Sequence, residues 1–205
     1  PASANYQSTL PGGTVVQGGA GDFTTISAAI TFIKGLNSTD YPRDKDNQWL
    51  IYVSPGTYKE NFSLPPFISL KGYSKNATIL EPTDDTSQHI LLSTDTSLMD
   101  VTLKSEIDNS SYTLVNVKSD EEASGFSSGN ITNNILVKDV EIVLSNINSI
   151  KVFDINKGNL NFENSFLNLE QDEFTSGDSN IYLFKLSGST TLDLVSSRIN
   201  VKSNY

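Results

Sequence analysis

Few side chains in this sequence are of the types that usually carry catalysis or bind a metal ion. His89 is the single histidine, so it cannot share a metal with a second imidazole, and we expect it to be structural. The absence of cysteine excludes disulfides, thiolate catalysis and cysteine-ligated zinc. Two acidic segments, 44–47 and 120–122, could bind calcium, but the first lacks the glycine and distal glutamate of a calcium loop, and we interpret both as solvated turns. We therefore predict no metal site and no cofactor.

Composition and charge narrow the classes of partner. Hydrophobic residues make up 37% of the 205 residues and charged residues 19%, and much of the remainder is Ser, Thr and Asn, which favours one β-rich domain with many turns. The formal net charge of -10 repels phosphate backbones, so we expect no nucleic acid partner. No apolar run approaches the length of a membrane span, and residues 1–6 lack the features of a signal peptide. We predict no membrane insertion and a location that is extracellular or on a virion surface.

The first third of the chain predicts an arm, a cap and one buried strand. Residues 1–13 are small and polar and end in Pro-Gly-Gly, so we predict a flexible N-terminal arm, followed by a short strand at 14–17. Four apolar residues then recur at helical spacing before Gly35, which predicts one short amphipathic helix. They are Ile26, Ala29, Ile30 and Ile33. Residues 49–53 predict a buried strand that ends at the turn 54–57.

The rest of the chain repeats one pattern of short apolar strands. Val137–Leu144 superposes on Phe162–Leu169 and on Leu194–Val201, and Leu98–Leu103 is a looser copy. Another apolar strand precedes each copy. Successive copies are spaced irregularly, roughly 25 to 40 residues apart, which is typical of a solenoid with loops of variable length. In such a solenoid Val137, Phe162 and Leu194 would lie in one column. A β-sandwich is the alternative, but it favours Asn-Gly or Asp-Gly hairpin turns, and the sequence contains neither dipeptide.

These patterns predict an all-β fold, a single-stranded right-handed parallel β-helix with a short N-terminal capping α-helix. We assign residues 1–13 to the arm and residues 14–205 to one domain, with the cap at 14–66 and the coils at 67–205. The helix would cover the open apolar end of the first coil. No capping segment follows the last strand, so we expect this uncapped C-terminal coil and the N-terminal arm to contact protein partners or to form a homo-oligomer.

Three segments, taken in order, resemble a known family. They are Gly19-Ala20-Gly21-Asp22-Phe23-Thr24-Thr25-Ile26, then Ile51-Tyr52-Val53 with Pro55-Gly56-Thr57-Tyr58-Lys59-Glu60-Asn61, then Ile68-Ser69-Leu70-Lys71-Gly72-Tyr73. Together they resemble the opening of the pectin methylesterases and their pectin-lyase-like relatives, over roughly residues 14 to 80. In that family this region caps and starts the β-helix, so the resemblance implies the fold, whereas catalysis belongs to later coils.

The resemblance also implies which residues a catalytic site would use. The family's esterases use one Asp as nucleophile, a second as acid/base, an orienting Arg, and Gln side chains for the oxyanion. Gln171 and Asp172 lie in a segment similar to the family's Gln-Asp-Thr-Leu motif, and Asn156 stands where the other glutamine would be. The nucleophile's position falls on Asn204, whose amide cannot attack as a carboxylate does. Asp172, Gln171 and Asn156 are therefore the catalytic candidates, and we expect Asp172 to be a solvated loop carboxylate.

The incomplete catalytic set favours a binding role over an enzymatic one. We predict a non-catalytic structural or attachment module, such as a virion, fibre or surface component, with a glycan as a further candidate ligand. The alternative is a carbohydrate esterase or lyase acting on acidic polysaccharide, although an acidic chain is poorly matched to a polyanion. Six aromatic residues could form a sugar-stacking platform or pack in the core. They are Tyr52, Tyr58, Phe62, Phe67, Tyr73 and Tyr112.

Overall fold

The computed structural model describes residues 12–15, 21–37, 39–83, 88–109, 111–118, 134–145, 147, 149–156, 158–171 and 181–203. These residues form one helix, α1 (Ile26–Gly35), and three sheets, each of which we number by its place in a coil. Sheet 1 has seven strands, β1 (Gly12–Val15), β2 (Trp49–Val53), β5 (Ile68–Gly72), β8 (Thr96–Met99), β11 (Asn134–Lys138), β14 (Gly158–Glu163) and β17 (Thr190–Val195). Sheet 2 has six, β3 (Gly56–Lys59), β6 (Thr78–Glu81), β9 (Thr102–Ser105), β12 (Glu141–Ser145), β15 (Phe166–Gln171) and β18 (Arg198–Ser203). Sheet 3 has five, β4 (Phe62–Leu64), β7 (Gln88–Leu92), β10 (Thr113–Val117), β13 (Ile150–Ile155) and β16 (Ile181–Leu186).

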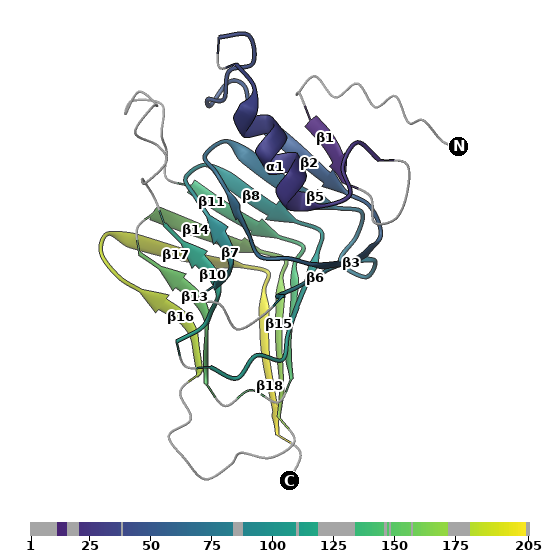
Figure 1. Cartoon of the computed structure of the whole chain (residues 1–205). Coiled ribbons are helices and arrows are strands. Elements are labelled where there is room, and N and C mark those ends of the chain that lie inside the picture. Colours follow the sequence, from purple (N-terminus) through teal and green to yellow (C-terminus); the bar gives the residue numbers. More distant parts are fainter. Residues whose placement is uncertain are drawn as a thin grey trace.

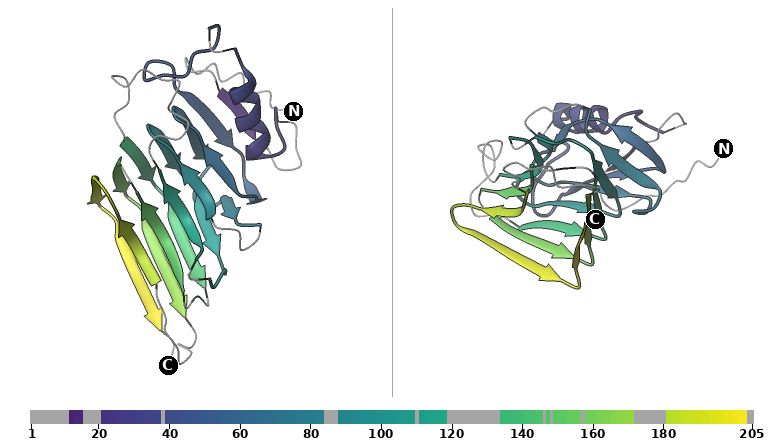
Figure 2. Two further views of the ribbon diagram at one scale, coloured as in Figure 1. Left: turned by 60° about the vertical axis from the view of Figure 1, so that its left-hand side comes forward. Right: turned by 90° about the horizontal axis from the view of Figure 1, so that it is seen from below.

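The chain winds through the three sheets in turn, and each coil stacks on the one before it (Figures 1 and 2). Every pairing between the named strands is parallel, for example β2 with β5, β3 with β6 and β4 with β7. This confirms the predicted parallel β-helix and rules out the sandwich, whose strands would pair antiparallel. The strand triplets begin at Trp49, inside the range 14–66 that the sequence assigned to the cap, and β1 begins at Gly12, inside the predicted arm.

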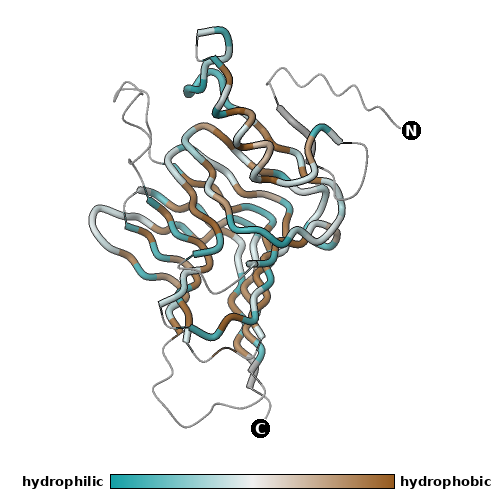
Figure 3. Tube along the Cα trace, in the orientation of Figure 1, coloured by the Kyte–Doolittle hydropathy of each residue, from teal (hydrophilic) through white to brown (hydrophobic). Residues whose placement is uncertain are grey.

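The core is built from columns of side chains that run along the helix axis. In sheet 1, Val137 pairs with Phe162 and Phe162 with Leu194, which confirms the predicted column. Leu98 and Leu70 extend the same column toward the first coil. Successive residues of a strand point to opposite faces, so apolar and polar residues alternate along each coil, as the hydropathy colours of Figure 3 show. Burying each large side chain of such a column contributes about 1.5 to 3 kcal/mol.

The corner between sheets 1 and 2 explains a second feature of the repeat. Asp100, Asp139, Asn164 and Ser196 occupy the same place in successive copies of the repeat, and all four have a positive φ, between 45° and 55°. This left-handed conformation is strained for most residues but is tolerated by Asp and Asn, whose short polar side chains bond locally. The Asn164 amide also donates a hydrogen bond to the Asp139 carboxylate one coil below. The recurring Asp or Asn is therefore a corner residue of the coil.

Helix α1 covers the first coil through its apolar face, and Figure 1 shows it lying across β1 and β2. Ile26, Ala29, Ile30 and Ile33 are all buried, which confirms the predicted amphipathic cap. The Glu60 carboxylate fixes the start of the helix, because it accepts hydrogen bonds from Ile26 N (2.9 Å), Ser27 N (2.9 Å) and Ser27 Oγ (2.7 Å). A carboxylate at this end also meets the positive pole of the helix dipole. In the described ranges no helix has the length and apolarity needed to cross a bilayer.

Replacing Gly72 with alanine is expected to destabilise the fold by about 2 kcal/mol or more, because interior overpacking forces the backbone to shift. A Cβ at Gly72 would lie against the Asp100 carbonyl oxygen, 2.8 Å from Val101 Cγ1 and 2.9 Å from Thr78 Cβ. Gly35→Ala is the matched control, since nothing lies within 4 Å of its added Cβ and alanine favours a helix. The free energy of unfolding in urea measures both. Equal effects of the two substitutions would contradict the close approach at Gly72.

Removing the Glu60 carboxylate is expected to loosen the cap. Glu60→Ala should lower the free energy of unfolding by about 2 to 3 kcal/mol, because hydrogen bonds to a charged acceptor are lost at the helix start. Glu60→Gln, which keeps one acceptor oxygen, should lower it less. Glu106→Ala is the control, because the Glu106 side chain is 66% exposed on sheet 2. Urea unfolding curves for the three variants test this, and an equal loss for Glu60→Ala and Glu106→Ala would refute it.

Candidate functional site

The three sequence-predicted catalytic candidates fall at different places in the coil. Asp172 lies outside the described residues. Gln171 is the last residue of β15 in sheet 2, where its backbone pairs with that of Ser203. The structure does not describe the side chain of Gln171. Asn156 is exposed and follows β13, where sheet 3 turns back to sheet 1. Gln171 therefore lies in sheet 2 and Asn156 at the end of a strand of sheet 3, and the catalytic roles of all three residues stay predictions.

Asn156 belongs to a ladder of polar side chains that crosses four coils. Asn116 Nδ2 donates to Gln88 Oε1 (2.8 Å), Asn156 Nδ2 donates to Asn116 Oδ1 (3.3 Å), and Ser187 Oγ donates to Asn156 Oδ1 (3.0 Å). Asn116 is in register with Leu91 and Asp154, so its amide reaches Gln88 and Asn156 diagonally, across strands that lie about 4.8 Å apart. Because an amide carries both donors and acceptors, this ladder presents both kinds of group on the outside of the helix.

Asp154 lies beside this ladder and has the most unusual environment of the described carboxylates. Its neighbours Phe153 and Ile155 are buried in the core, so Asp154 points to the outer face of sheet 3, in register with Asn116 and Lys185. The residue is only 8% exposed. Oδ2 is 3.4 Å from the ammonium of Lys185, whereas Oδ1 is buried and has no hydrogen-bond partner among the described residues. An enclosed acceptor without a donor costs about 1 to 3 kcal/mol and calls for an explanation.

We call these residues the Asp154 cluster: Gln88, Asn116, Asp154, Asn156, Lys185 and Ser187. Sequence reasoning missed its central residue. The sequence does show one carboxylate, Asp154, inside the apolar strand Val152-Phe153-Asp154-Ile155. A charged side chain in such a buried strand needs a partner of opposite charge or a hydrogen-bond donor. The partner Lys185 lies one coil away, and only the register of β13 with β16 brings the two side chains together.

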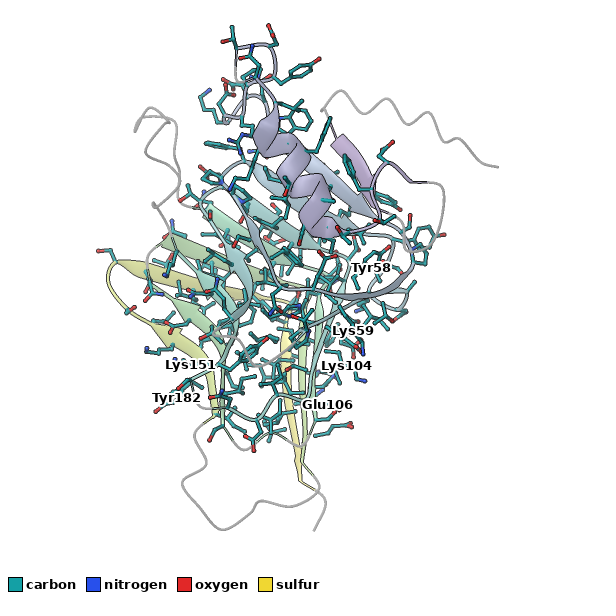
Figure 4. The ribbon with its side chains drawn as sticks, in the orientation of Figure 1. Tyr58, Lys59, Lys104, Glu106, Lys151 and Tyr182 are labelled. Atoms are coloured by element: carbon teal, nitrogen blue, oxygen red, sulfur yellow. The ribbon has the colours of Figure 1, made fainter. Side chains whose placement is uncertain are left out.

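One position without a register partner in each strand separates the Asp154 cluster from a second outer row of sheet 3. Thr113, Lys151 and Tyr182 pair in register, and so do Val115, Phe153 and Phe184, whereas the residue between them has no register partner in any of these strands. That residue is Leu114, Val152 or Leu183. Leu114 and Val152 are buried together with the next residue, so two successive side chains of each strand are buried at this point. Figure 4 shows Lys151 and Tyr182 close together at this end of β13 and β16.

Several other charged and aromatic residues that the structure describes make contacts that stabilise the fold. Lys59, Glu81, Lys104 and Glu106 form a chain of ion pairs on sheet 2, with distances of 3.4, 3.8 and 3.5 Å. Asp44 accepts backbone hydrogen bonds from Asp46 and Asn47 and so closes a local turn. Of the six aromatic residues considered as a sugar platform, Tyr58, Phe62, Phe67 and Tyr112 are buried in the core. Among the described residues no group of three His, Asp or Glu side chains is placed to hold a metal ion.

His89 is enclosed in the core on β7. It is fully buried, and the edge of its ring meets Phe62 at a centroid distance of 6.3 Å. Neither ring nitrogen has a hydrogen-bond partner among the described residues, and the Glu60 backbone is near but outside hydrogen-bond geometry. Burial lowers the pKa of His89 to about 4, and the Glu60 backbone opposes this only in part. The ring is therefore neutral at ordinary pH, which makes it a core side chain.

The last coil is open. Leu186, Leu194 and Val201 lie at inward positions of β16, β17 and β18, yet each is about half exposed, at 48%, 50% and 58%. The matching residues of earlier coils, such as Ile155, Phe162 and Leu169, are buried by the coil that follows them. The expectation that a second copy or another protein contacts this end stays a prediction, which the mass of the protein in solution would test.

Comparison with known proteins identifies the fold. Neither a protein-family model nor a curated protein sequence matches the chain. Among solved structures, the pectin methylesterase from carrot superposes with a TM-score of 0.61 at 17% identity, covering 95% of this chain and 65% of the enzyme. PemA, the pectin methylesterase of Erwinia chrysanthemi, gives 0.59 at 16% identity, over 96% of this chain and 68% of the enzyme.

A pectin methylesterase in complex with a hexasaccharide gives a TM-score of 0.60 at 17% identity, over 96% of this chain and 68% of that one. The chain therefore spans about two thirds of the length of these enzymes. At this identity the likeness shows the fold alone. The chain has the right-handed parallel β-helix of the pectin methylesterases, as its opening segments predicted.

The neutral His89 predicts a pH-dependent stability. Below pH 6.5 the unfolded chain binds a proton on this ring, while the folded protein, with a pKa of about 4, does not. Stability should therefore be unaffected by His89 above pH 6.5 and fall as the pH drops toward 4, by about 2.5 kcal/mol at pH 4.5. Urea unfolding of the natural chain and of His89→Leu at pH 7 and 4.5 isolates this part of the acid dependence. An equal loss of stability in the two proteins would contradict it.

Proposed function

We propose that this β-helix is a non-catalytic attachment module that binds carbohydrate on the outer face of sheet 3. The observation that carries the proposal is the Asp154 cluster, where an amide ladder across four coils flanks a carboxylate, one oxygen of which has no donor within the described ranges. Sugar hydroxyl groups both donate and accept hydrogen bonds, and amides, a carboxylate and an ammonium offer the complementary set. The exposed ring of Tyr182 on the neighbouring row adds an apolar surface of the kind that packs on sugar rings.

The rigidity of the site supports binding over chemistry. Gln88, Asn116, Asp154 and Lys185 lie in the paired strands β7, β10, β13 and β16, and the backbone N–H groups of Asn156 and Ser187 bond to the neighbouring coil, so the backbone positions of the cluster are fixed before a ligand arrives. The cluster contains one carboxylate, whereas the esterase mechanism that the resemblance implies needs a nucleophile and a separate acid/base. An attachment module of this kind would act outside the cell or on a virion surface, and its partners would be glycans and neighbouring proteins.

A carbohydrate esterase or lyase acting on acidic polysaccharide is the second candidate. It is favoured by one observation, because Asp154 lies within 3.4 Å of the Lys185 ammonium and next to a ladder that includes Asn156. A carboxylate, a cation and an amide are the kinds of group that ester hydrolysis uses for attack, orientation and oxyanion binding. The two candidates differ in whether a bound saccharide is turned over.

We expect a labelled glycan panel to show saccharide binding, and we expect no methanol release from methyl-esterified pectin at high protein concentration. Tyr182→Ala should weaken binding by a few fold if the ring packs on sugar, since a stacked aromatic is worth about 1 kcal/mol. Tyr73→Ala is the control, because this ring is also exposed but lies at the corner between sheets 1 and 2.

A panel without any bound saccharide would refute the attachment role. Methanol release that is abolished by Asp154→Ala or Asp172→Ala would establish the esterase candidate in its place.

A further inference from the structure

The unpaired oxygen of Asp154 restricts the chemistry of the ligand, and this inference rests on the proposed function. An ionised carboxylate is an acceptor only, so Oδ1 can be satisfied only by a group that brings a hydrogen-bond donor. A hydroxyl group of a sugar brings one, whereas the carboxylate of an acidic sugar brings further acceptors and a charge of the same sign. We propose that the Asp154 cluster selects neutral saccharides, one of whose hydroxyl groups donates to Asp154 Oδ1.

The two members of the ion pair differ in how firmly they are held. The Asp154 side chain is 11% exposed and comes from the middle of the core-packed strand β13, whereas that of Lys185 is 48% exposed on the last described strand of sheet 3. At 3.4 Å their contact is long for a charge-assisted hydrogen bond, which normally measures about 2.7 to 2.9 Å. Lys185 is therefore the partner that a ligand can reach directly, and its ammonium can donate to a hydroxyl oxygen, whereas contact with the enclosed Oδ1 requires the side chains around Asp154 to shift.

The surroundings of the pair match a second hydroxyl group. The amides of Asn116 and Asn156 are linked to each other at 3.3 Å, a long contact that leaves donor and acceptor capacity on both residues. A sugar with two adjacent hydroxyl groups could thus donate to Asp154 with one and bond to an amide or to Lys185 with the other. Within the cluster the charges of Asp154 and Lys185 cancel, so a neutral ligand leaves no charge uncompensated.

Binding of fluorescently labelled neutral hexose oligosaccharides and of oligogalacturonate to the full chain tests this inference. Asp154→Asn should weaken binding of the neutral oligosaccharides about fivefold, because a hydrogen bond to a charged acceptor is worth about 1 kcal/mol more than one to the neutral oxygen that asparagine keeps. The substitution should also narrow the preference for neutral over acidic ligands. Glu106→Gln removes the same charge on sheet 2 and should leave both affinities unchanged.

The possible failures separate the two claims. If no saccharide binds the natural chain, the proposed attachment role fails and this inference fails with it. If a saccharide binds but Asp154→Asn matches Glu106→Gln, the selection by Asp154 is wrong while the attachment role stands. Tighter binding of oligogalacturonate than of the neutral oligosaccharides would also overturn the selection. Thermal unfolding of both variants tests whether they are folded. The Asp154→Asn protein should remain folded, because the substitution removes one ion pair, the 3.4 Å contact with Lys185.

Discussion

Parallel, in-register stacking of the coils is the constraint on which every other feature of the molecule depends. A single coil cannot bury its apolar residues, because its strands have no partners of their own and its interior is open on both sides. Stacking pairs each strand with the next and closes columns such as Leu98, Val137 and Phe162 against one another. A shift of one residue in any strand would turn its column outward, so register and core specify each other.

The same constraint determines what happens at the corners and at the ends. Each coil must turn at the same place, which is why Asp100, Asp139 and Asn164 share one left-handed conformation. In sheets 2 and 3 the first coil has no preceding strand among the described residues, and the amphipathic helix α1 covers this end of the stack. Glu60 from the first coil holds that helix by its backbone. The cap is therefore tied to the stack by hydrogen bonds as well as by burial.

The features that follow from periodicity were predictable, and those that follow from contacts between coils were not. The apolar spacing of Ile26 to Ile33 and the repeat around Val137 carry their own periods, and both predictions were confirmed. The pairing of Asp154 with Lys185 depends on a register across a loop of variable length, which no local pattern encodes. The unpaired positions in sheet 3 could not be predicted either, because two successive apolar residues such as Leu114 and Val115 also occur in an ordinary buried strand. Asn156 was selected through the family resemblance, and its place in an amide ladder became visible only once the coils were stacked.

A stacked coil also determines what kind of function this fold can support. Side chains at one position recur about every 4.8 Å along the axis, so the outer faces present rows of similar groups, whereas a catalytic site needs different groups that converge. Two ladders obey that rule, Asn134 with Asn159 and Asn168 with Asn200. Asp154 breaks it, because one rung of an amide ladder is flanked by a buried charge that no other described coil repeats in sheet 3. A stack that depends on repetition carries such an exception at a cost to its stability, and a ligand that supplies a donor to Asp154 would offset that cost.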